Sequence, residues 1–166
     1  TVQLALGDAL AIATMRYKKF DKLDFKKLHP AGSLGAQLKT VEDIMITGKK
    51  IPFVNENLQT AKALKILSEK NLGILVIRNK KKFTTGIITD GQIRRFIQKN
   101  SNFQSLPVKK MMTKKPIFID KNELAAKALS IMNNNKITSL IVNNKNKPQT
   151  TIGVVHVHTI LQSNIS

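Results

Sequence analysis

Three histidines are the side chains of this sequence best suited to proton transfer or metal binding: His29, His156 and His158. A histidine suits general acid–base chemistry because its ordinary pKa lies close to neutrality. His156 and His158 stand two residues apart, a spacing that can bind a metal ion, but no third ligand follows nearby, so we expect no metal site. The chain has no cysteine, which excludes disulfides, thiolate nucleophiles and cysteine-ligated metals.

Positive charge is the strongest feature of the composition, with 28 lysines and arginines against 10 acidic residues and a net charge of +18. A field of this size favours nucleic acid, anionic membranes or phosphorylated ligands. The lysines are scattered in pairs, however, and only four of the cations are arginine, so no basic stripe is present. We expect no nucleic-acid partner. A basic nucleic-acid-binding domain is kept as one alternative hypothesis for the function of the chain. Nucleic-acid binding that weakens steeply with salt would favour it.

The length of 166 residues, 42% of them hydrophobic, suits one domain or two small ones with a packed core. No apolar run approaches the roughly 20 residues that span a bilayer, so we expect no membrane contact. Asp8 interrupts the first apolar stretch and no basic region precedes it, unlike a signal peptide. Together with the absence of cysteine, these features predict a cytoplasmic protein.

The N-terminal region, residues 1–40, differs from the rest of the chain. Residues 1–16 predict a helix that is apolar over more than half of its circumference, and such a helix normally packs inside a larger body. Asp24 is expected to cap a short helix over residues 25–28, and the small residues at 31–35 predict a linker or a loop placed near another chain. We therefore expect residues 1–40 to be the last helix and the linker of a truncated domain.

An internal repeat organises the remainder of the chain. The spacing between matched residues is 67 at both ends of the repeated unit and 65 in between. Two small differences in length explain this shift, and both fall in polar, turn-like sequence, where insertions are tolerated. Self-similarity at matched apolar positions indicates two copies of one supersecondary unit. The matched segments are 41–45 with 108–112, 53–54 with 118–119, 61–64 with 126–129, 75–77 with 140–142, and 86–88 with 153–155.

Each copy predicts the order β-α-β-β-α. A three-stranded sheet cannot bury its face alone, so the two sheets are expected to pack against each other around a pseudo-twofold axis. The expected fold class is α+β, with one unit over residues 41–103 and the other over 104–166. The expected strands are 51–54, 73–77 and 84–89, then 117–119, 139–142 and 151–156; the helices that follow the first strands are about 58–70 and about 123–134.

The tandem units resemble paired cystathionine-β-synthase-type (CBS) domains. The resemblance rests on the motifs DIM at residues 43–45, GIITD at 86–90 and IRR at 93–95. Upstream, LGDALA at 6–11 and HPAGSLG at 29–35 resemble the junction in arabinose 5-phosphate isomerases, in which a sugar-isomerase (SIS) domain precedes the CBS pair. The joint order of these motifs is much more specific than any one of them.

The resemblance implies that the chain is a regulatory and dimerisation module cut from such an isomerase. The parent would interconvert D-ribulose 5-phosphate and D-arabinose 5-phosphate for Kdo and lipopolysaccharide biosynthesis, without a cofactor. By resemblance, His29 corresponds to the family's proposed catalytic histidine. It would act only in the full-length enzyme, since the other catalytic carboxylates and the phosphate loop are missing here, and the fragment alone is predicted to be inactive.

The resemblance also raises the question of a nucleotide site. In CBS domains the T-x-x-D motif supplies a hydroxyl and a carboxylate that accepts hydrogen bonds from a ribose diol. Here the first unit offers Thr89, Asp90 and Gln92, and the second offers His156 and Thr159. A neutral glutamine should hold a diol more weakly than a carboxylate, so these five residues predict a weak nucleotide site or an anion site. Asp90 has an alternative role as the cap of the helix that follows it.

The expected partners follow from the same resemblance. Two chains should form a homodimer through their CBS pairs, the full-length enzyme should form a higher homo-oligomer, and a nucleotide or a CMP-sugar is the possible effector. The alternative hypothesis is a stand-alone CBS pair that senses nucleotides in another protein. The two hypotheses differ in whether the native gene continues upstream of Thr1 into a SIS domain.

Overall fold

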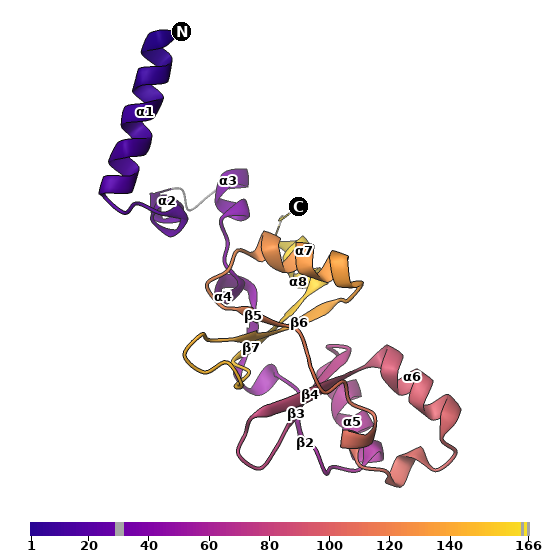
Figure 1. Ribbon diagram of the computed structural model, residues 1–166. Coiled ribbons are helices and arrows are strands. Elements are labelled where there is room, and N and C mark those ends of the chain that lie inside the picture. The colour runs from indigo at the N-terminus through magenta and orange to yellow at the C-terminus, as the bar shows by residue number, and fades with distance from the viewer. Residues whose placement is uncertain (29–31, 164, 166) are drawn as a thin grey trace.

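The computed structural model describes residues 1–28, 32–163 and 165, and it contains two β-sheets with helices on their outer faces (Figure 1). The α-helices are α1 (Val2–Tyr17), α2 (Lys22–Leu28), α3 (Gly32–Gln37), α4 (Val41–Ile44), α5 (Thr60–Lys70), α6 (Asp90–Lys99), α7 (Ala125–Asn135) and α8 (Val157–Gln162). The strands are β1 (Ile46–Thr47), β2 (Phe53–Asn55), β3 (Ile74–Arg78), β4 (Thr84–Thr89), β5 (Phe118–Asp120), β6 (Ser139–Asn143) and β7 (Gly153–His156). Short 3-10 helices are η1 (Gly48–Lys50), η2 (Phe103–Ser105) and η3 (Val108–Lys110).

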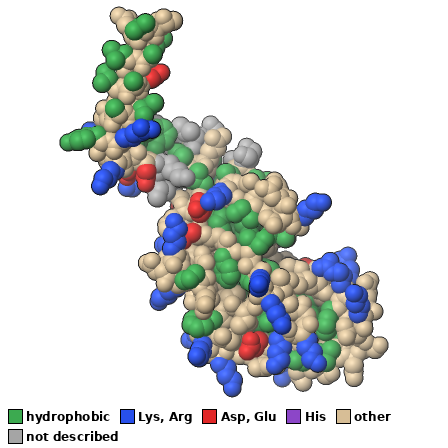
Figure 2. Space-filling view, viewed as in Figure 1, with side chains coloured by type: hydrophobic (Ala, Val, Ile, Leu, Met, Phe, Trp, Pro, Cys, Tyr) green, Lys and Arg blue, Asp and Glu red, His purple; other side chains and the backbone are tan. Residues whose placement is uncertain are grey.

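Helix α1 projects away from the two sheets, and none of its described residues is buried (Figure 1). The predicted N-terminal helix is confirmed. Its apolar side chains are exposed on several sides, with Val2 at 79% and Leu10 at 61% exposure, and they give α1 its green patches in Figure 2. Lys and Arg side chains are scattered over both units on the face shown there. None of the helices in the described residues is long and apolar enough to cross a membrane.

Two local predictions for the N-terminal region are wrong. The helix expected over residues 25–28 begins earlier, as α2, because the Asp24 N–H donates to Asp21 Oδ1 at 3.0 Å and Asp21 therefore precedes the first turn. Residues expected to form a linker instead form α3 from Gly32 onward. His29 lies outside the described residues.

The repeated β-α-β-β-α order is confirmed. The first sheet has the order β2-β3-β4, and in the second sheet β7, β6 and β5 follow the same pattern. In each unit the first strand pairs in parallel with the second, so Phe53 lies opposite Val76 and Phe118 lies opposite Ile141. Helices α5 and α6 cover the outer face of the first sheet, and α7 and α8 cover that of the second (Figure 1).

The inner faces of the two sheets share one apolar cluster. Phe53 and Phe118 both pack against this cluster, so these matched residues have equivalent environments. The hydroxyls of Thr84 and Thr151, which are also matched positions, form a hydrogen bond of 2.7 Å with each other across the pseudo-twofold axis. The predicted sheet-to-sheet packing is therefore confirmed. The buried members of the cluster are Ile51, Ile74, Val76, Ile141 and Val154.

The prediction of two three-stranded sheets is wrong for the second sheet, which has four strands. The additional strand, β1, comes from the first unit and pairs antiparallel with β7, with Ile46 opposite Val154. The first sheet has a matching bridge, in which Thr113 of the second unit pairs with Ile87 of β4. A two-residue strand is too short to show an alternating pattern, which is why sequence periodicity did not reveal β1.

Residues 40–47, which lie before β2, and residues 107–113, which lie before β5, are called the leading segments below. Each leading segment is hydrogen-bonded to the other unit in the same way. The Val41 N–H donates to the Glu123 carbonyl at 2.8 Å, and the Val108 N–H donates to the Leu58 carbonyl at 2.9 Å. Val41 packs in the core beneath α7, and Val108 packs in the core beneath α5. The two units have therefore exchanged their leading segments.

A methionine of each leading segment lies over a glycine of the sheet that it joins. A Cβ atom added to Gly153 would lie 2.5 Å from Met45 Sδ, and one added to Gly86 would lie 2.9 Å from Met112 Sδ. At Gly86 the Thr113 carbonyl oxygen would also be only 2.6 Å away. The two matched glycines are thus required because another chain segment passes directly over them.

We predict that Gly86→Ala destabilises the chain more than Gly153→Ala. The new methyl group at Gly86 meets the Thr113 backbone, which must move, whereas at Gly153 it meets only the flexible Met45 side chain. Expected losses in the free energy of unfolding are about 2–3 kcal/mol and about 1 kcal/mol respectively, measured by urea denaturation. Gly91→Ala, which meets nothing closer than 3.8 Å, serves as the control and should be neutral or slightly stabilising. Equal losses at Gly86 and Gly153 would contradict the prediction.

Candidate functional site

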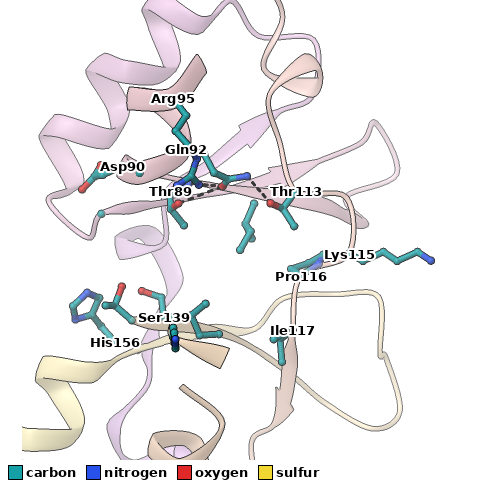
Figure 3. Close-up of a pocket in the computed structure, with 16 residues that line it drawn as sticks. Thr89, Asp90, Gln92, Arg95, Thr113, Lys115, Pro116, Ile117, Ser139 and His156 are labelled. Atoms are coloured by element: carbon teal, nitrogen blue, oxygen red, sulfur yellow. Dashed lines mark hydrogen bonds between the residues drawn. The ribbon is translucent and has the colours of Figure 1, made fainter. Parts of the chain in front are cut away.

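A cavity of about 570 Å³ lies between the two units, a volume typical of small-molecule sites (Figure 3). The first unit contributes the end of β4 and the start of α6. The second unit contributes the segment before β5, the turn between α7 and β6, and the end of β7. The polar and charged residues that line the cavity are Thr89, Asp90, Gln92, Arg95, Thr113, Lys115, Lys136, Thr138, Ser139 and His156.

Four of the five residues predicted as nucleotide-site candidates line this one cavity. Thr89, Asp90 and Gln92 lie on the side of the first unit, and His156 lies on the side of the second unit (Figure 3). Thr159 is on α8 and does not line the cavity. The structure thus brings together residues that are far apart in the sequence, while ligand binding by them stays a prediction.

The side chain of Gln92 is occupied by bonds within the protein. Its Oε1 accepts hydrogen bonds from the Thr89 N–H at 2.9 Å and from the Thr89 hydroxyl at 3.3 Å. Its Nε2 donates to the hydroxyl of Thr113, which belongs to the leading segment of the second unit. A ribose diol would compete with these internal bonds for Oε1, and the expected role of Gln92 as an acceptor for a diol stays a prediction. In this structure Gln92 links the start of α6 to the other unit.

Thr89, rather than Asp90, is the N-cap residue of α6, so the alternative role suggested for Asp90 is wrong. Asp90 is the first residue of the helix, where a carboxylate interacts favourably with the helix dipole. Its side chain lies against Gly73, since a Cβ atom added to that glycine would be 3.2 Å from Asp90 Oδ2. Asp90 is the single carboxylate among the residues that line the cavity.

Three cations line the cavity: Arg95, Lys115 and Lys136. None of them forms an ion pair with any residue that the structure describes. Against them stands one carboxylate, Asp90, so the cavity has a positive balance and suits an anionic ligand. None of the three was predicted from the sequence as a site residue, because they lie on separate elements. The signal that could have found them is the repeat, which predicts which loops of the two units meet.

His156 ends β7 and is the N-cap residue of α8. Its Nδ1 accepts a hydrogen bond from the His158 N–H at 3.2 Å, and the two imidazole rings stack with their centroids 5.0 Å apart. Burial lowers the pKa of His156, and the nearby charge of His158 lowers it further. Only neutral imidazole can accept at Nδ1, so the observed cap requires the neutral form.

The described residues include no group of three His, Cys, Asp or Glu side chains that could hold a metal ion.

We predict that stability falls as the pH drops below about 6.5, the ordinary histidine pKa. In that range the unfolded chain takes up a proton at His156 while the folded chain resists it, so protonation favours unfolding. His156→Asn removes the titrating group and keeps an acceptor at the N-cap position. Urea midpoints at about pH 5.5 and about pH 7.5 should differ less in this variant than in the natural chain. If the urea midpoints of His156→Asn at the two pH values differ as much as those of the natural chain, groups other than His156 cause the pH dependence.

The sequence comparisons fit this architecture. The CBS domain family matches this chain twice, over residues 41–99 and 108–165. The chain is 36% identical over 166 residues to the arabinose 5-phosphate isomerase KdsD of Salmonella typhi and, over the same length, to KdsD of Escherichia coli K12. It is also 33% identical over 165 residues to the uncharacterized protein RP505 of Rickettsia prowazekii. Each match covers 99% of this chain and 50% of the relative, so the chain spans about half the length of these proteins.

Solved structures show the same fold. The CBS domain pair of protein MJ0100, crystallised with 5-methylthioadenosine and S-adenosyl-L-methionine, matches with a TM-score of 0.66 and 22% identity over 75% of this chain and 94% of that one. CBSX2, crystallised with AMP, matches with a TM-score of 0.64 and 19% identity over the same shares. At these identities the likeness concerns the fold. The two family matches, the paired sheets and the exchanged leading segments together lead to one conclusion: the chain belongs to the CBS domain family and contains a tandem CBS pair.

Proposed function

We propose that this chain is the regulatory and dimerisation module of an arabinose 5-phosphate isomerase. The observation that carries the proposal is the extent of the match to KdsD, which covers 99% of the chain at 36% identity. The CBS family match begins only at residue 41, so the likeness to KdsD also includes the region that precedes the CBS pair. A stand-alone CBS pair from another protein would share the pair without that region.

The exposure of α1 supports a link to a further domain. Leu4, Leu6 and Ile12 are each more than half exposed, although apolar residues on a helix are usually buried against a neighbour. In the proposed enzyme a SIS domain covers this helix. The CBS pair then follows through α2 and α3. Ligand binding at the cavity would affect the catalytic domain through this connection.

The proposed reaction interconverts D-ribulose 5-phosphate and D-arabinose 5-phosphate, which feeds Kdo and lipopolysaccharide biosynthesis in the cytoplasm. Aldose–ketose isomerisation moves a proton between adjacent carbons, so it needs a group that can accept and return a proton. His29 is the proposed group, supplied to the SIS active site from between α2 and α3. This chain by itself carries no SIS catalytic domain in the proposal and should not turn over the substrate.

The isomerase proposal is tested by comparing the complete gene product with residues 1–166. The complete protein should interconvert the two pentose phosphates, and His29→Asn should lower kcat about 100-fold or more, because general acid–base groups contribute on this scale. The 166-residue chain should show no turnover in the same coupled assay. His158→Asn, at an exposed residue of the CBS pair, is the matched control and should keep nearly full activity. Turnover by the 166-residue chain, or full activity of His29→Asn, would reject the proposed roles.

We also propose that two chains form a homodimer through the outer helices of their CBS pairs, and that the full-length enzyme forms a higher homo-oligomer. Ile97 on α6 and Leu161 on α8 are apolar side chains with 38% and 53% exposure on these helices. Exposed apolar residues on surface helices are typical of an interface between subunits.

The dimer is tested by light scattering at micromolar concentration, where the mass should be twice the 18.5 kDa of one chain. Leu161→Glu should shift the mass toward the monomer, because it places a charge in the proposed interface. Leu4→Glu on α1 is the control and should leave the dimer intact. Dissociation by Leu4→Glu alone would show instead that α1 joins the chains, and a monomeric natural chain would reject the dimer.

The cavity between the units is the proposed effector site, with a nucleotide or a CMP-sugar as the ligand. Its volume, its cations and its hydroxyl groups support a phosphorylated ligand. The related folds of MJ0100 and CBSX2 were crystallised with adenosine-containing ligands, which makes nucleotides reasonable probes for this chain.

A further inference from the structure

Two matched turns of the repeat lie side by side, away from the cavity. Residues 79–83 join β3 to β4, residues 144–152 join β6 to β7, and the two are called the lysine turns below. The Thr84 N–H donates to the Gln149 carbonyl at 2.9 Å, so the turns are bonded to each other at their base. In Figure 1 both turns extend from the same side of the two sheets. They precede β4 and β7, whose opposite ends line the cavity, so the lysine turns form one surface at the other end of these strands.

The lysine turns carry a concentrated positive charge. They contain five exposed lysines and no acidic residue. None of these lysines forms an ion pair with a residue that the structure describes. The carboxylate of Asp120 is bonded to one turn, but it accepts its hydrogen bonds from the backbone N–H groups of Asn122 and Lys145. The lysine charges therefore repel one another, and an anionic partner would remove this repulsion. The five residues are Lys80, Lys81, Lys82, Lys145 and Lys147.

The fold does not require lysine at these positions. Asn79 closes the first turn, because its Oδ1 accepts from the Phe83 N–H and its carbonyl accepts from the Lys82 N–H, both at 3.0 Å. Lys82 has a φ of 64°, which lies in the left-handed region where glycine and asparagine are favoured. The turn would therefore form at least as well without this lysine, and the charge is free to serve a partner.

An apolar side chain accompanies the lysines. Phe83 directly follows Lys82 and is 41% exposed. An aromatic ring flanked by lysines is typical of segments that adsorb to the headgroup region of a bilayer. The lysine turns contain no arginine and a single aromatic residue, so they are less suited to reading nucleic acid. They do not line the cavity and project from the sheets, which suits a broad, flat partner (Figure 1).

We propose that the lysine turns bind the surface of an anionic lipid bilayer. The five lysines lie among the lipid headgroups, and the ring of Phe83 lies at the boundary with the acyl chains. The expectation of no membrane contact rests on the lack of an apolar run long enough to span a bilayer, and adsorption to the surface needs no such run. Because the cavity lies at the opposite ends of β4 and β7, it stays accessible when the turns are bound.

The first test is sedimentation of the 166-residue chain with lipid vesicles. The chain should bind vesicles of phosphatidylcholine mixed with phosphatidylglycerol, less so as salt rises, and should not bind phosphatidylcholine alone. The combined change Lys80→Gln, Lys81→Gln and Lys82→Asn should weaken binding about 10-fold or more. The matched control removes three exposed cations of α5 and α6 and should weaken binding less than about 3-fold. Urea midpoints report whether both variants fold. The control changes are Lys65→Gln, Lys70→Gln and Arg94→Gln.

The second test places a fluorescent reporter in the first lysine turn. The chain has no tryptophan, so a single introduced one reports its own surroundings. The emission of Phe83→Trp should shift to shorter wavelengths with the phosphatidylglycerol vesicles, because the ring leaves water. Tyr17→Trp on α1, at a residue with 89% exposure, is the control and should not shift. This control matters because the exposed apolar residues of α1 offer a second route to the bilayer.

Several results would overturn the inference. Equal weakening by the two triple variants would assign vesicle binding to the net charge of +18 rather than to the lysine turns. A shift of Tyr17→Trp without a shift of Phe83→Trp would assign it to α1. A single-stranded RNA that loses its binding in the turn variant, while vesicle binding persists, would make nucleic acid the partner of the turns. The isomerase proposal is decided separately by the His29→Asn assay.

Discussion

The apolar contact between the two sheets is the interaction on which the rest of the molecule depends. Each sheet has helices on its outer face only, so its inner face would meet water if the units separated. Val76 and Ile141, which are matched residues, are fully buried in this contact. Removing such surface from water contributes roughly 25 cal/mol per Å². The pseudo-twofold axis, the exchanged leading segments and the cavity all follow from keeping these two faces together.

The exchange of leading segments fixes the walls of the cavity. Thr113 pairs with Ile87 of β4 through two backbone hydrogen bonds, of 2.9 and 3.1 Å, and also bonds to Gln92 at the start of α6. The chain then continues past Lys115 into the second unit. One wall of the cavity is therefore attached to both units. A change in the separation of the sheets would alter the relative positions of Gln92 and Lys115.

The repeat allowed most of the fold to be predicted, because matched apolar positions report the same buried environments twice. Phe53 and Phe118 are an example, and β4 has the predicted bounds. What the pattern could not show was where short segments pair. The β1 strand has two residues, and its partner β7 lies in the other unit, so no local periodicity records the contact. Capping was also misjudged at Asp24 and Asp90, because neighbouring residues compete for the same N-terminal amides.

The candidate site was predicted only in part for a related reason. Thr89, Asp90 and Gln92 belong to one motif, and the motif located one side of the cavity. Lys136 ends α7 and Ser139 begins β6, in a stretch with no motif of its own, and their proximity to Gln92 depends on the sheet contact. The bonding of Gln92 to Thr113 could not be inferred either, since it joins two units through side chains. Local sequence thus indicates chemistry, whereas convergence of distant loops requires the tertiary structure.

The exchanged segments also determine the mechanical connection of the N-terminal region. The Lys39 carbonyl accepts a hydrogen bond from the Ala125 N–H at 2.8 Å, and Val41 is buried beneath α7, so the chain leaving α3 is anchored in the second unit. Figure 1 shows α3 beside α7, far from α5. The unit that comes first in the sequence is therefore the distal one in space. A pull or twist applied through α3 would therefore act first on the second unit. It would reach the first unit, which follows α3 in the sequence, only afterwards.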